Sequence, residues 1–247
     1  MFNPPRLIGH RGVKNLSPEN TLNSICLANK LGLKWVEIDI KISKDLIPIL
    51  LHDDSLERTT SGKGLPINFE YHNLKKLDAG LFFYNHPTQI YIPTLKEVIN
   101  LCEQLDMCLN IELKPNFGFV KKNVEAITEL LKISNFTKQH FFSSFDLDSI
   151  ILMKDTLPNA YCGLLIDEFN KEMSLKNLID VCLKYNLFSC GFNKNIINSD
   201  IIHEMNKNNI LITIYSEKNL RFSEANELWS MGIKSIFTDD PSEFKIF

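Results

Sequence analysis

The amino-acid sequence predicts an α/β protein, a (β/α)8 barrel with a small insertion after a hairpin that contains the second strand. Three observations favour this fold. Short apolar segments typical of buried strands alternate with amphipathic segments typical of helices along the chain. Eight such strand segments can be counted, whereas an open doubly wound sheet usually has fewer. The sequence also has no GxGxxG or GxxxxGK motif, the glycine-rich turn that such open sheets usually carry.

The first strand is expected at residues 7–9, and the first helix is expected from Leu22 to Leu31. Asn20 or Thr21 can cap this helix, because either side-chain oxygen can accept a hydrogen bond from an unpaired N–H group of the first turn. Gly32 is expected to end the helix.

Residues 35–53 are expected to form the second strand and the hairpin that returns from it. The first half alternates with the period of a strand, so that Glu37 and Asp39 share one face while valine and isoleucine residues occupy the other. Considered alone, this stretch is equally typical of a surface hairpin with a solvated acidic face.

The register of this hairpin determines which residues meet across it. A turn centred on residues 44–45 would place His52 opposite Glu37, and Leu50 opposite Asp39, in an antiparallel pair. This pairing predicts that a titratable imidazole returns to the two carboxylates.

Residues 54–93 lose clear periodicity and are too long for an ordinary connection. We therefore expect an insertion with some structure of its own, which contains Phe82, Phe83 and Tyr84. A helix restarts after Thr94, which has a glutamate three residues later and so forms a capping box.

Beyond this point strands and helices alternate regularly. The expected strands are residues 107–113, 140–143, 161–166, 187–191, 210–215 and 235–238. The expected helices are residues 120–132, 147–154, 175–184, 199–208 and 219–231. Because no linker, repeat or low-complexity run interrupts this pattern, residues 1–247 are expected to form a single domain.

Composition excludes several classes of protein. With 27 basic and 30 acidic side chains, the 247-residue chain lacks the positive excess of a nucleic-acid-binding protein. It has neither a secretory signal nor an apolar run long enough to span a bilayer, so a soluble cytoplasmic protein without membrane insertion is expected. The six cysteines form no CxxC pair and are expected to be buried thiols. The sequence predicts no oligomeric state.

Polar residues gather where three neighbouring strands end, and the active site of such a barrel lies at this rim. These residues are His10, Arg11, Glu37, Asp39, Glu112 and Lys114. The three carboxylates would repel one another unless a cation neutralised them, and oxygen ligands suit Mg²⁺ or Ca²⁺. The alternative is an ion-pair network without a metal, formed by the carboxylates with Arg11 and Lys114.

Two histidines are expected at this rim, His10 and His52. Such imidazoles could act as base and acid on a phosphate ester, while Arg11, Lys114 and the cation stabilise charge on the phosphoryl oxygens. The remaining histidines are expected to be structural or surface residues; they are His72, His86, His140 and His203.

Several short motifs follow one another along the chain. They are His10-Arg11-Gly12, Pro18-Glu19-Asn20-Thr21, Glu37-x-Asp39, His52-Asp53, Leu56-x-Arg58-Thr59-Thr60, Gly62-x-Gly64, Ile92-Pro93-Thr94-Leu95, Glu112-x-Lys114, Ser144-Phe145 and Thr238-Asp239-x-Pro241. Together they resemble the glycerophosphodiester phosphodiesterases. This resemblance implies a TIM barrel that hydrolyses glycerophosphodiesters, such as glycerophosphocholine or glycerophosphoethanolamine, to sn-glycerol 3-phosphate and an alcohol.

The resemblance also implies roles for the residues already singled out. Metal ligands would be Glu37, Asp39 and Glu112, the acid–base pair would be His10 and His52, and the phosphate would be bound by Arg11 and Lys114. It decides neither which histidine is the base, nor whether water attacks directly or a cyclic phosphate forms first.

Two departures from the family pattern stand out. The seventh strand usually reads Trp-Thr-Val-Asn, whereas this chain has Ile212 and Tyr215 at the outer positions, which affects substrate preference. The hairpin turn usually has glycine where this chain has Leu46, so a turn without positive φ is expected there.

Two other functions compete with this one. A lysophospholipase D-like or other lipid phosphodiesterase could grip an acyl chain with Phe82, Phe83, Tyr84 and Phe119, although these rings are expected to pack the insertion onto the barrel. A non-catalytic phosphodiester-binding module would have lost a metal ligand or a catalytic histidine, and this chain has lost neither.

Overall fold

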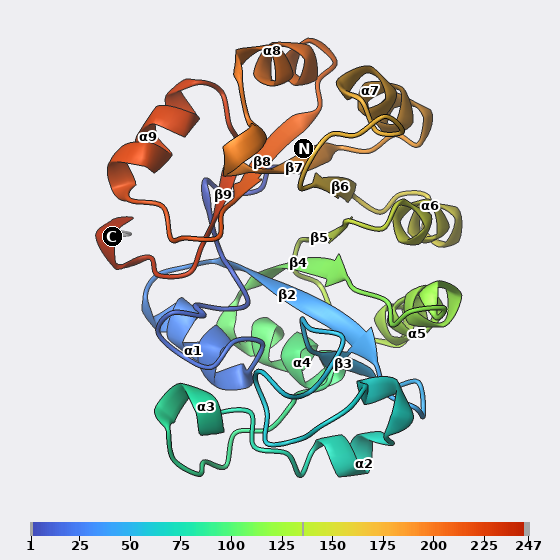
Figure 1. Ribbon diagram of the computed structural model, residues 1–247, viewed down its shortest axis with the longest axis vertical. Helices are drawn as coiled ribbons and strands as arrows, with labels where there is room; N and C mark the ends of the chain where they lie inside the picture. Colours follow the sequence, from blue (N-terminus) through green and yellow to red (C-terminus); the bar gives the residue numbers. More distant parts are fainter. Residues whose placement is uncertain (1, 135, 245–247) are drawn as a thin grey trace.

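Eight parallel strands close into a barrel in the computed structural model, which describes residues 2–134 and 136–244 (Figure 1). The strands are β1 (Leu7–Gly9), β2 (Trp35–Ile42), β4 (Cys108–Leu113), β5 (His140–Ser144), β6 (Cys162–Ile166), β7 (Ser189–Asn193), β8 (Leu211–Tyr215) and β9 (Ser235–Thr238). Neighbours follow chain order around the barrel, and β9 pairs with β1 to close it. The predicted (β/α)8 TIM barrel is confirmed.

Helices surround this barrel (Figure 1). They are α1 (Leu22–Lys30), α4 (Leu95–Leu105), α5 (Val120–Ile133), α6 (Leu147–Thr156), α7 (Leu175–Lys184), α8 (Ser199–Lys207) and α9 (Phe222–Ser230). Short 3₁₀ turns occur at η2 (Lys194–Ile196) and η3 (Ser242–Phe244). No helix in the described ranges is both long and apolar enough to cross a membrane.

The predicted helix starts are confirmed at α1 and α4. Thr21 caps α1, its Oγ1 accepting a hydrogen bond from the Ser24 amide at 3.2 Å, and Thr94 forms the expected capping box. The last helix begins three residues later than predicted. Asn219 is not helical because its Oδ1 accepts hydrogen bonds from Thr238 Oγ1 and from the amide of Asp239 at the end of β9.

The core has two main parts. One fills the space between strands and helices, and the other is an aromatic layer inside the barrel, where Trp35, Phe141 and Phe237 are buried. Phe2 extends this layer and stacks on Tyr161 with a ring-centroid distance of 4.1 Å. All six cysteines are free; four are buried, as predicted, while Cys26 and Cys108 are half-buried.

The segment 54–93 carries structure of its own, as expected. It contains η1 (Pro66–Asn68), α2 (Tyr71–Leu74) and α3 (Leu81–Tyr84), and a small separate core with the strand β3 (Pro48–Leu50). The aromatic residues of α3 do not pack this segment onto the barrel, contrary to expectation. Phe82, Phe83 and Tyr84 each remain more than a third exposed.

The predicted hairpin register is wrong by one residue. Leu50 of β3 pairs with Ile40 of β2, not with Asp39. The turn runs from Ser43 to Leu46, and its last residue, Leu46, is also the bulge position. The loop therefore has an odd number of residues. Leu46 therefore has a φ of 60°, and the expectation that it avoids positive φ is also wrong.

This conformation makes a stability prediction for Leu46, which is 41% exposed. Leu46→Asn and Leu46→Ala both remove the apolar side chain, but asparagine tolerates the left-handed region much better than alanine. We expect the asparagine variant to be more stable by about 1 kcal/mol in urea unfolding. Equal stability of the two variants would contradict the assigned turn.

Candidate active site

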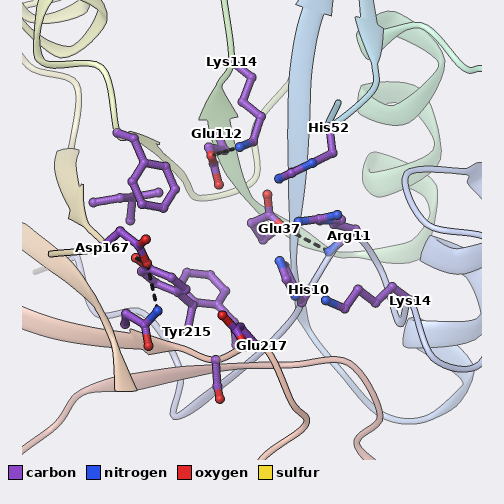
Figure 2. Close-up of a pocket in the computed structure, with 15 residues that line it drawn as sticks. His10, Arg11, Lys14, Glu37, His52, Glu112, Lys114, Asp167, Tyr215 and Glu217 are labelled. Carbon is purple, nitrogen blue, oxygen red and sulfur yellow. Dashed lines mark hydrogen bonds and ion pairs between the residues drawn. The ribbon is translucent and has the colours of Figure 1, made fainter. Parts of the chain in front are cut away.

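A cavity of about 370 Å³ opens at the carboxyl ends of the barrel strands (Figure 2). Six of the seven residues predicted for the site line it: His10, Arg11, Glu37, His52, Glu112 and Lys114. The seventh, Asp39, lies beside Glu37 and Glu112. The structure therefore brings all seven together. The other four histidines do not line this cavity.

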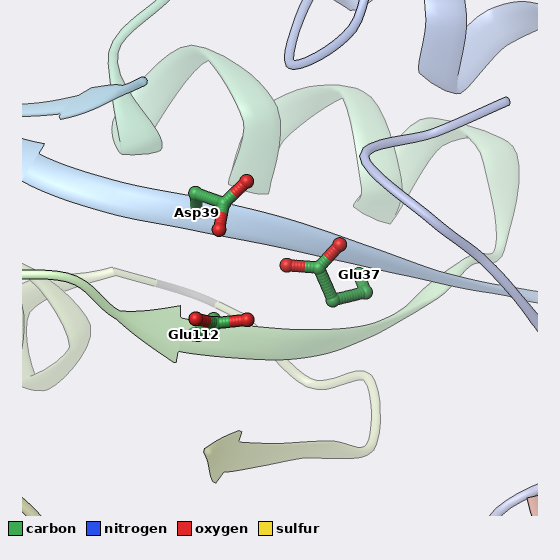
Figure 3. A group of neighbouring side chains, drawn as sticks. All are labelled: Glu37, Asp39 and Glu112. Carbon is green, nitrogen blue, oxygen red and sulfur yellow. The ribbon is translucent and has the colours of Figure 1, made fainter. Parts of the chain in front are cut away.

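Three carboxylates form a compact cluster beneath the cavity (Figure 3). Glu37 and Asp39 share the inward face of β2, and the parallel pairing of β2 with β4 places Glu112 next to Asp39. One oxygen of each side chain lies within 4.8 Å of the corresponding oxygens of the other two. All three residues are buried.

Electrostatic repulsion in this cluster is visible in the pKa values. Burial raises the pKa of Glu112 to about 7, and the nearby charge of Asp39 adds to the effect. Burial and the charge of Asp39 also raise the pKa of Glu37 well above its usual value. Burial opposes ionisation of Asp39 too, but the positive charges of Arg11 and Lys114 outweigh it and lower the pKa. Three ionised carboxylates need more positive charge than these two side chains supply.

The cluster fits a divalent cation. One buried oxygen of each carboxylate, Glu37 Oε1, Asp39 Oδ1 and Glu112 Oε1, has no hydrogen-bond partner among the described residues. Lys114 Nζ approaches Glu112 Oε1 to 2.9 Å as an ion pair, but without the alignment of a hydrogen bond. Buried carboxylate oxygens without partners are costly, and oxygen ligands suit Mg²⁺ or Ca²⁺. The ion pairs of the alternative network exist, and Lys114 serves Glu112, yet Glu37 Oε1 has no partner among the described residues and Asp39 Oδ1 has only Lys114 Nζ at 3.8 Å.

Arg11 is tied to the acidic side chains around it. Its amide donates a hydrogen bond to Glu37 Oε2 at 2.8 Å, a geometry that accompanies a φ of 50° at this residue. Its guanidinium donates to Glu19 Oε1 at 2.8 Å and approaches Asp39 Oδ2 to 3.3 Å. Arg11 thus helps to position two carboxylates of the cluster while it lines the cavity.

His10 is oriented by the opposite end of the chain. Its Nδ1 lies 2.7 Å from Asp239 Oδ1, just after β9, and Lys14 Nζ lies 3.3 Å from the second oxygen of Asp239. Burial lowers the pKa of His10, although the hydrogen bond to Asp239 opposes the shift. A carboxylate that accepts from Nδ1–H leaves Nε2 of a neutral ring available to a ligand.

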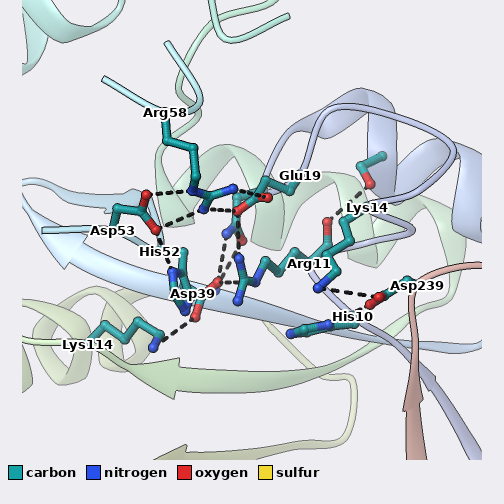
Figure 4. A network of polar contacts seen from close by, with 12 residues as sticks. His10, Arg11, Lys14, Glu19, Asp39, His52, Asp53, Arg58, Lys114 and Asp239 are labelled. Carbon is teal, nitrogen blue, oxygen red and sulfur yellow. Dashed lines mark hydrogen bonds and ion pairs between the residues drawn. The ribbon is translucent and has the colours of Figure 1, made fainter. Parts of the chain in front are cut away.

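His52 lies beyond the last residue pair of the hairpin. Although the predicted register was wrong, its ring lines the same cavity as Glu37. Its Nδ1 lies 2.7 Å from Asp53 Oδ1 (Figure 4). Burial lowers the pKa of His52, and the charge of Asp39 opposes this effect. Both imidazoles thus have a carboxylate at Nδ1.

A second arginine supports this arrangement. Arg58 donates two hydrogen bonds to each of Glu19 and Asp53, over distances of 2.6–2.8 Å (Figure 4). Glu19 also accepts from Arg11, so one network connects the residues next to His10 with those next to His52.

The sequence did not assign site roles to these supporting residues, although each belongs to a quoted motif, and Asn20 was only a candidate helix cap, a role that Thr21 takes; they are Glu19, Asn20, Asp53, Arg58 and Asp239. Asn20, for instance, has a φ of 56° and exchanges hydrogen bonds with Asp39, through its side chain, at 2.8 and 3.1 Å. Their presence in motifs was the available signal. Their contacts depend on the folded barrel.

Glu19 should make stability depend on pH. Burial would raise its pKa, but hydrogen bonds from Arg58 and the charge of Arg11 lower it to about 2, below the ordinary value of 4.5. A lowered carboxyl pKa stabilises the fold above the unfolded-state pKa, and this stabilisation is lost as pH falls toward the folded-state pKa. We expect the free energy of unfolding of wild type to exceed that of Glu19→Gln by about 3 kcal/mol at pH 7. This difference should shrink from pH 5 to pH 3.

Urea unfolding at several pH values tests this dependence. Glu168→Gln is a matched control, because Glu168 is exposed and lies in none of the ion pairs between described residues. It should change stability little at any pH. A pH-independent difference between wild type and Glu19→Gln would contradict the role of its charge.

Comparisons with known proteins agree with this geometry. Residues 10–243 match the glycerophosphoryl diester phosphodiesterase family. A glycerophosphodiester phosphodiesterase of Caldanaerobacter subterraneus is 30% identical over 236 residues, which cover 95% of this chain and 94% of that protein. One from Bacillus altitudinis is 29% identical and covers 96% and 95% of the two chains.

Solved structures show the same fold. An Oleispira antarctica phosphodiesterase, solved in complex with the product sn-glycerol-3-phosphate, superposes with a TM-score of 0.89 at 30% identity and covers 98% of this chain and 95% of its own. A glycerophosphodiester phosphodiesterase of Thermotoga maritima has a TM-score of 0.74 at 25% identity, with coverage of 99% and 98%.

Proposed function

Since this chain belongs to the glycerophosphoryl diester phosphodiesterase family and is a glycerophosphodiester-hydrolysing enzyme, we propose that it acts with one divalent cation and two histidines. Glu37, Asp39 and Glu112 would hold the cation, Mg²⁺ or Ca²⁺. His10 and His52 are the acid–base pair. The products are sn-glycerol 3-phosphate and an alcohol.

One observation carries this proposal: a buried cluster of three carboxylates, with two positively charged side chains beside it, lies at a cavity that is also lined by two carboxylate-oriented imidazoles. A bound divalent cation would supply positive charge to the phosphoryl oxygens as the transition state forms. Lys114 adds positive charge at the same place, because burial, which would lower its pKa, is outweighed by Glu112 and Asp39.

The two imidazoles supply the proton transfers. Burial lowers the pKa of each ring, and the hydrogen bond to its carboxylate opposes the shift. Each carboxylate, Asp239 for His10 and Asp53 for His52, accepts from Nδ1–H and directs Nε2 to the cavity. The ring that acts as base is neutral and takes the proton of the attacking hydroxyl group at Nε2. The ring that acts as acid carries a second proton, taken from solvent, at Nε2 and gives it to the leaving oxygen; the carboxylate at its Nδ1 stabilises this protonated form.

The activity itself can be tested on purified protein. With Mg²⁺ or Ca²⁺ present, we expect the protein to release sn-glycerol 3-phosphate from glycerophosphoethanolamine. A coupled dehydrogenase assay measures this release. Lysophosphatidylcholine should be a poor substrate, because the aromatic residues that could grip an acyl chain, Phe82, Phe83, Tyr84 and Phe119, line neither of the two cavities beside the histidines. Faster hydrolysis of the lysophospholipid would favour a lipid phosphodiesterase instead.

A further inference from the structure

The wall of the cavity across from His52 carries Asp167, and a second carboxylate, Glu217, also lines the cavity. Asp167 follows β6 and Glu217 follows β8, and both line the cavity. Figure 2 shows Asp167 with Tyr215 across the opening from His52, Arg11 and Lys14. Neither carboxylate belongs to any ion pair between described residues. Their negative charge is therefore not compensated within this part of the chain.

Asp167 is held in place by neutral groups. Its Oδ1 accepts hydrogen bonds from Asn193 Nδ2 at 2.8 Å and from the hydroxyl of Tyr215 at 3.1 Å. Burial and the charge of Asp167 raise the pKa of Tyr215, so its hydroxyl stays a donor at neutral pH. These bonds orient the carboxylate without neutralising it.

Aromatic rings lie between this wall and the phosphate-binding side. Phe145, which is 45% exposed, meets Tyr215 edge to face with a ring-centroid distance of 5.5 Å. Lys114 Nζ already lies 5.4 Å from the Phe145 ring centroid. Aromatic rings beside carboxylates are the surroundings in which organic ammonium groups bind.

The opposite wall has the reverse charge. Arg11, Lys14 and Lys114 line it, and the carboxylates of Glu37 and Glu112 line the same cavity, where a cation would hold the phosphate. The cavity is therefore dipolar, with phosphate-binding groups on one side and two uncompensated carboxylates on the other. A zwitterionic diester would align with this polarity.

A second cavity of about 430 Å³ shares His52, Glu112, Lys114 and Phe145 with the first. Its own acidic residues are already engaged. Asp54 accepts from Lys41 Nζ at 2.8 Å, and Asp146 caps α6 by accepting from the Ser149 amide at 2.8 Å. Two spaces therefore meet at the candidate centre, as the two substituents of a diester require. Asp146 belongs to no ion pair between described residues either, but the positive end of α6, which it caps, offsets its charge, so only the first space carries two carboxylates without a nearby positive charge.

We propose that the enzyme selects glycerophosphodiesters whose alcohol carries an ammonium group. The ammonium binds between Asp167, Glu217 and the ring of Tyr215, and the neutral glycerol occupies the second cavity. This selectivity rests on the proposed function, because it assumes that the phosphate lies at the carboxylate cluster and the histidines.

Specificity ratios test the proposal. We expect kcat/KM for glycerophosphocholine and glycerophosphoethanolamine to exceed that for glycerophosphoglycerol and glycerophosphoinositol about tenfold, an advantage expected of a cation beside carboxylates and aromatic rings. Asp167→Asn and Glu217→Gln should each lower the ratio of kcat/KM for cationic to neutral substrates roughly two- to fivefold. Glu168→Gln, next in sequence to Asp167 but outside the lining of this cavity, should leave the ratio unchanged.

Misfolding would lower kcat/KM for both substrate classes together and leave their ratio unchanged. A change in the ratio therefore reports a loss of selectivity. An unchanged ratio in both Asp167→Asn and Glu217→Gln would overturn the proposal, as would a wild-type preference for the neutral diesters. Calorimetric binding of the same diesters, with Mg²⁺ present, separates the two proposals. Tighter binding of the cationic diesters without turnover would refute the proposed function but support the selectivity.

Discussion

Glu37→Gln and Asp39→Asn should each reduce kcat/KM by about 10³-fold or more and remove the stabilisation of the fold by divalent cations. Each substitution removes an anionic ligand from a cluster in which one oxygen per carboxylate has no partner. Electrostatic stabilisation of a phosphoryl transition state by a cation is worth several kcal/mol, which corresponds to losses of this size. Steady-state assays and thermal unfolding with Mg²⁺, Ca²⁺ or a chelator measure both effects.

The stabilities without cation should differ in the opposite sense. Glu37→Gln removes a carboxyl group whose pKa is raised by burial and by the charges of Asp39 and Glu112, so the chelated variant should be at least as stable as chelated wild type. Glu57→Gln, at an exposed carboxylate of the insertion, is the control and should respond to cations like wild type. Undiminished turnover by thoroughly chelated wild type would refute the metal site.

His10→Ala and His52→Ala should each lower kcat by about 10²- to 10⁴-fold, the usual contribution of general acid or base catalysis. The fold and the cation response should survive, because neither imidazole belongs to the carboxylate cluster. His203→Ala, at an exposed position on α8, should keep full activity.

Two further variants distinguish a reacting imidazole from one that only shapes the cavity. Asp239→Asn and Asp53→Asn keep each histidine but change the partner of Nδ1, so they should cost less than the alanine variants and alter the pH dependence of kcat/KM. If His10→Ala or His52→Ala retained wild-type turnover, the two-histidine mechanism would be wrong.

The sequence predicted the barrel and the cluster because these depend on local patterns. Alternation along residues 35–42 places Glu37 and Asp39 on one face, and the order of parallel strands brings Glu112 beside them. The prediction of the hairpin register was wrong because the number of loop residues decides the register. Leu46 occupies a left-handed position of this loop that usually takes glycine. Patterns of apolar residues do not report such a turn.

The supporting network could not be predicted for a different reason. Asp239 is 229 residues from His10 in the chain, and Glu19 meets Arg58 across 39 residues. No local periodicity encodes such contacts, which follow from loop conformations on top of the barrel. The late start of α9 has the same origin, because the Asn219 side chain bonds to the end of β9 and not to the helix.

The hydrogen bond between His10 and Asp239 joins the first and last strands of the barrel. Closing a loop of this length carries a large entropic cost and belongs to the slow, non-local part of folding. A chain being synthesised can build the carboxylate cluster from β2 and β4 long before residue 239 exists, but it cannot orient His10. Recovery of turnover during refolding should therefore lag behind recovery of helical signal, and enzyme activity would serve as a direct reporter of ring closure.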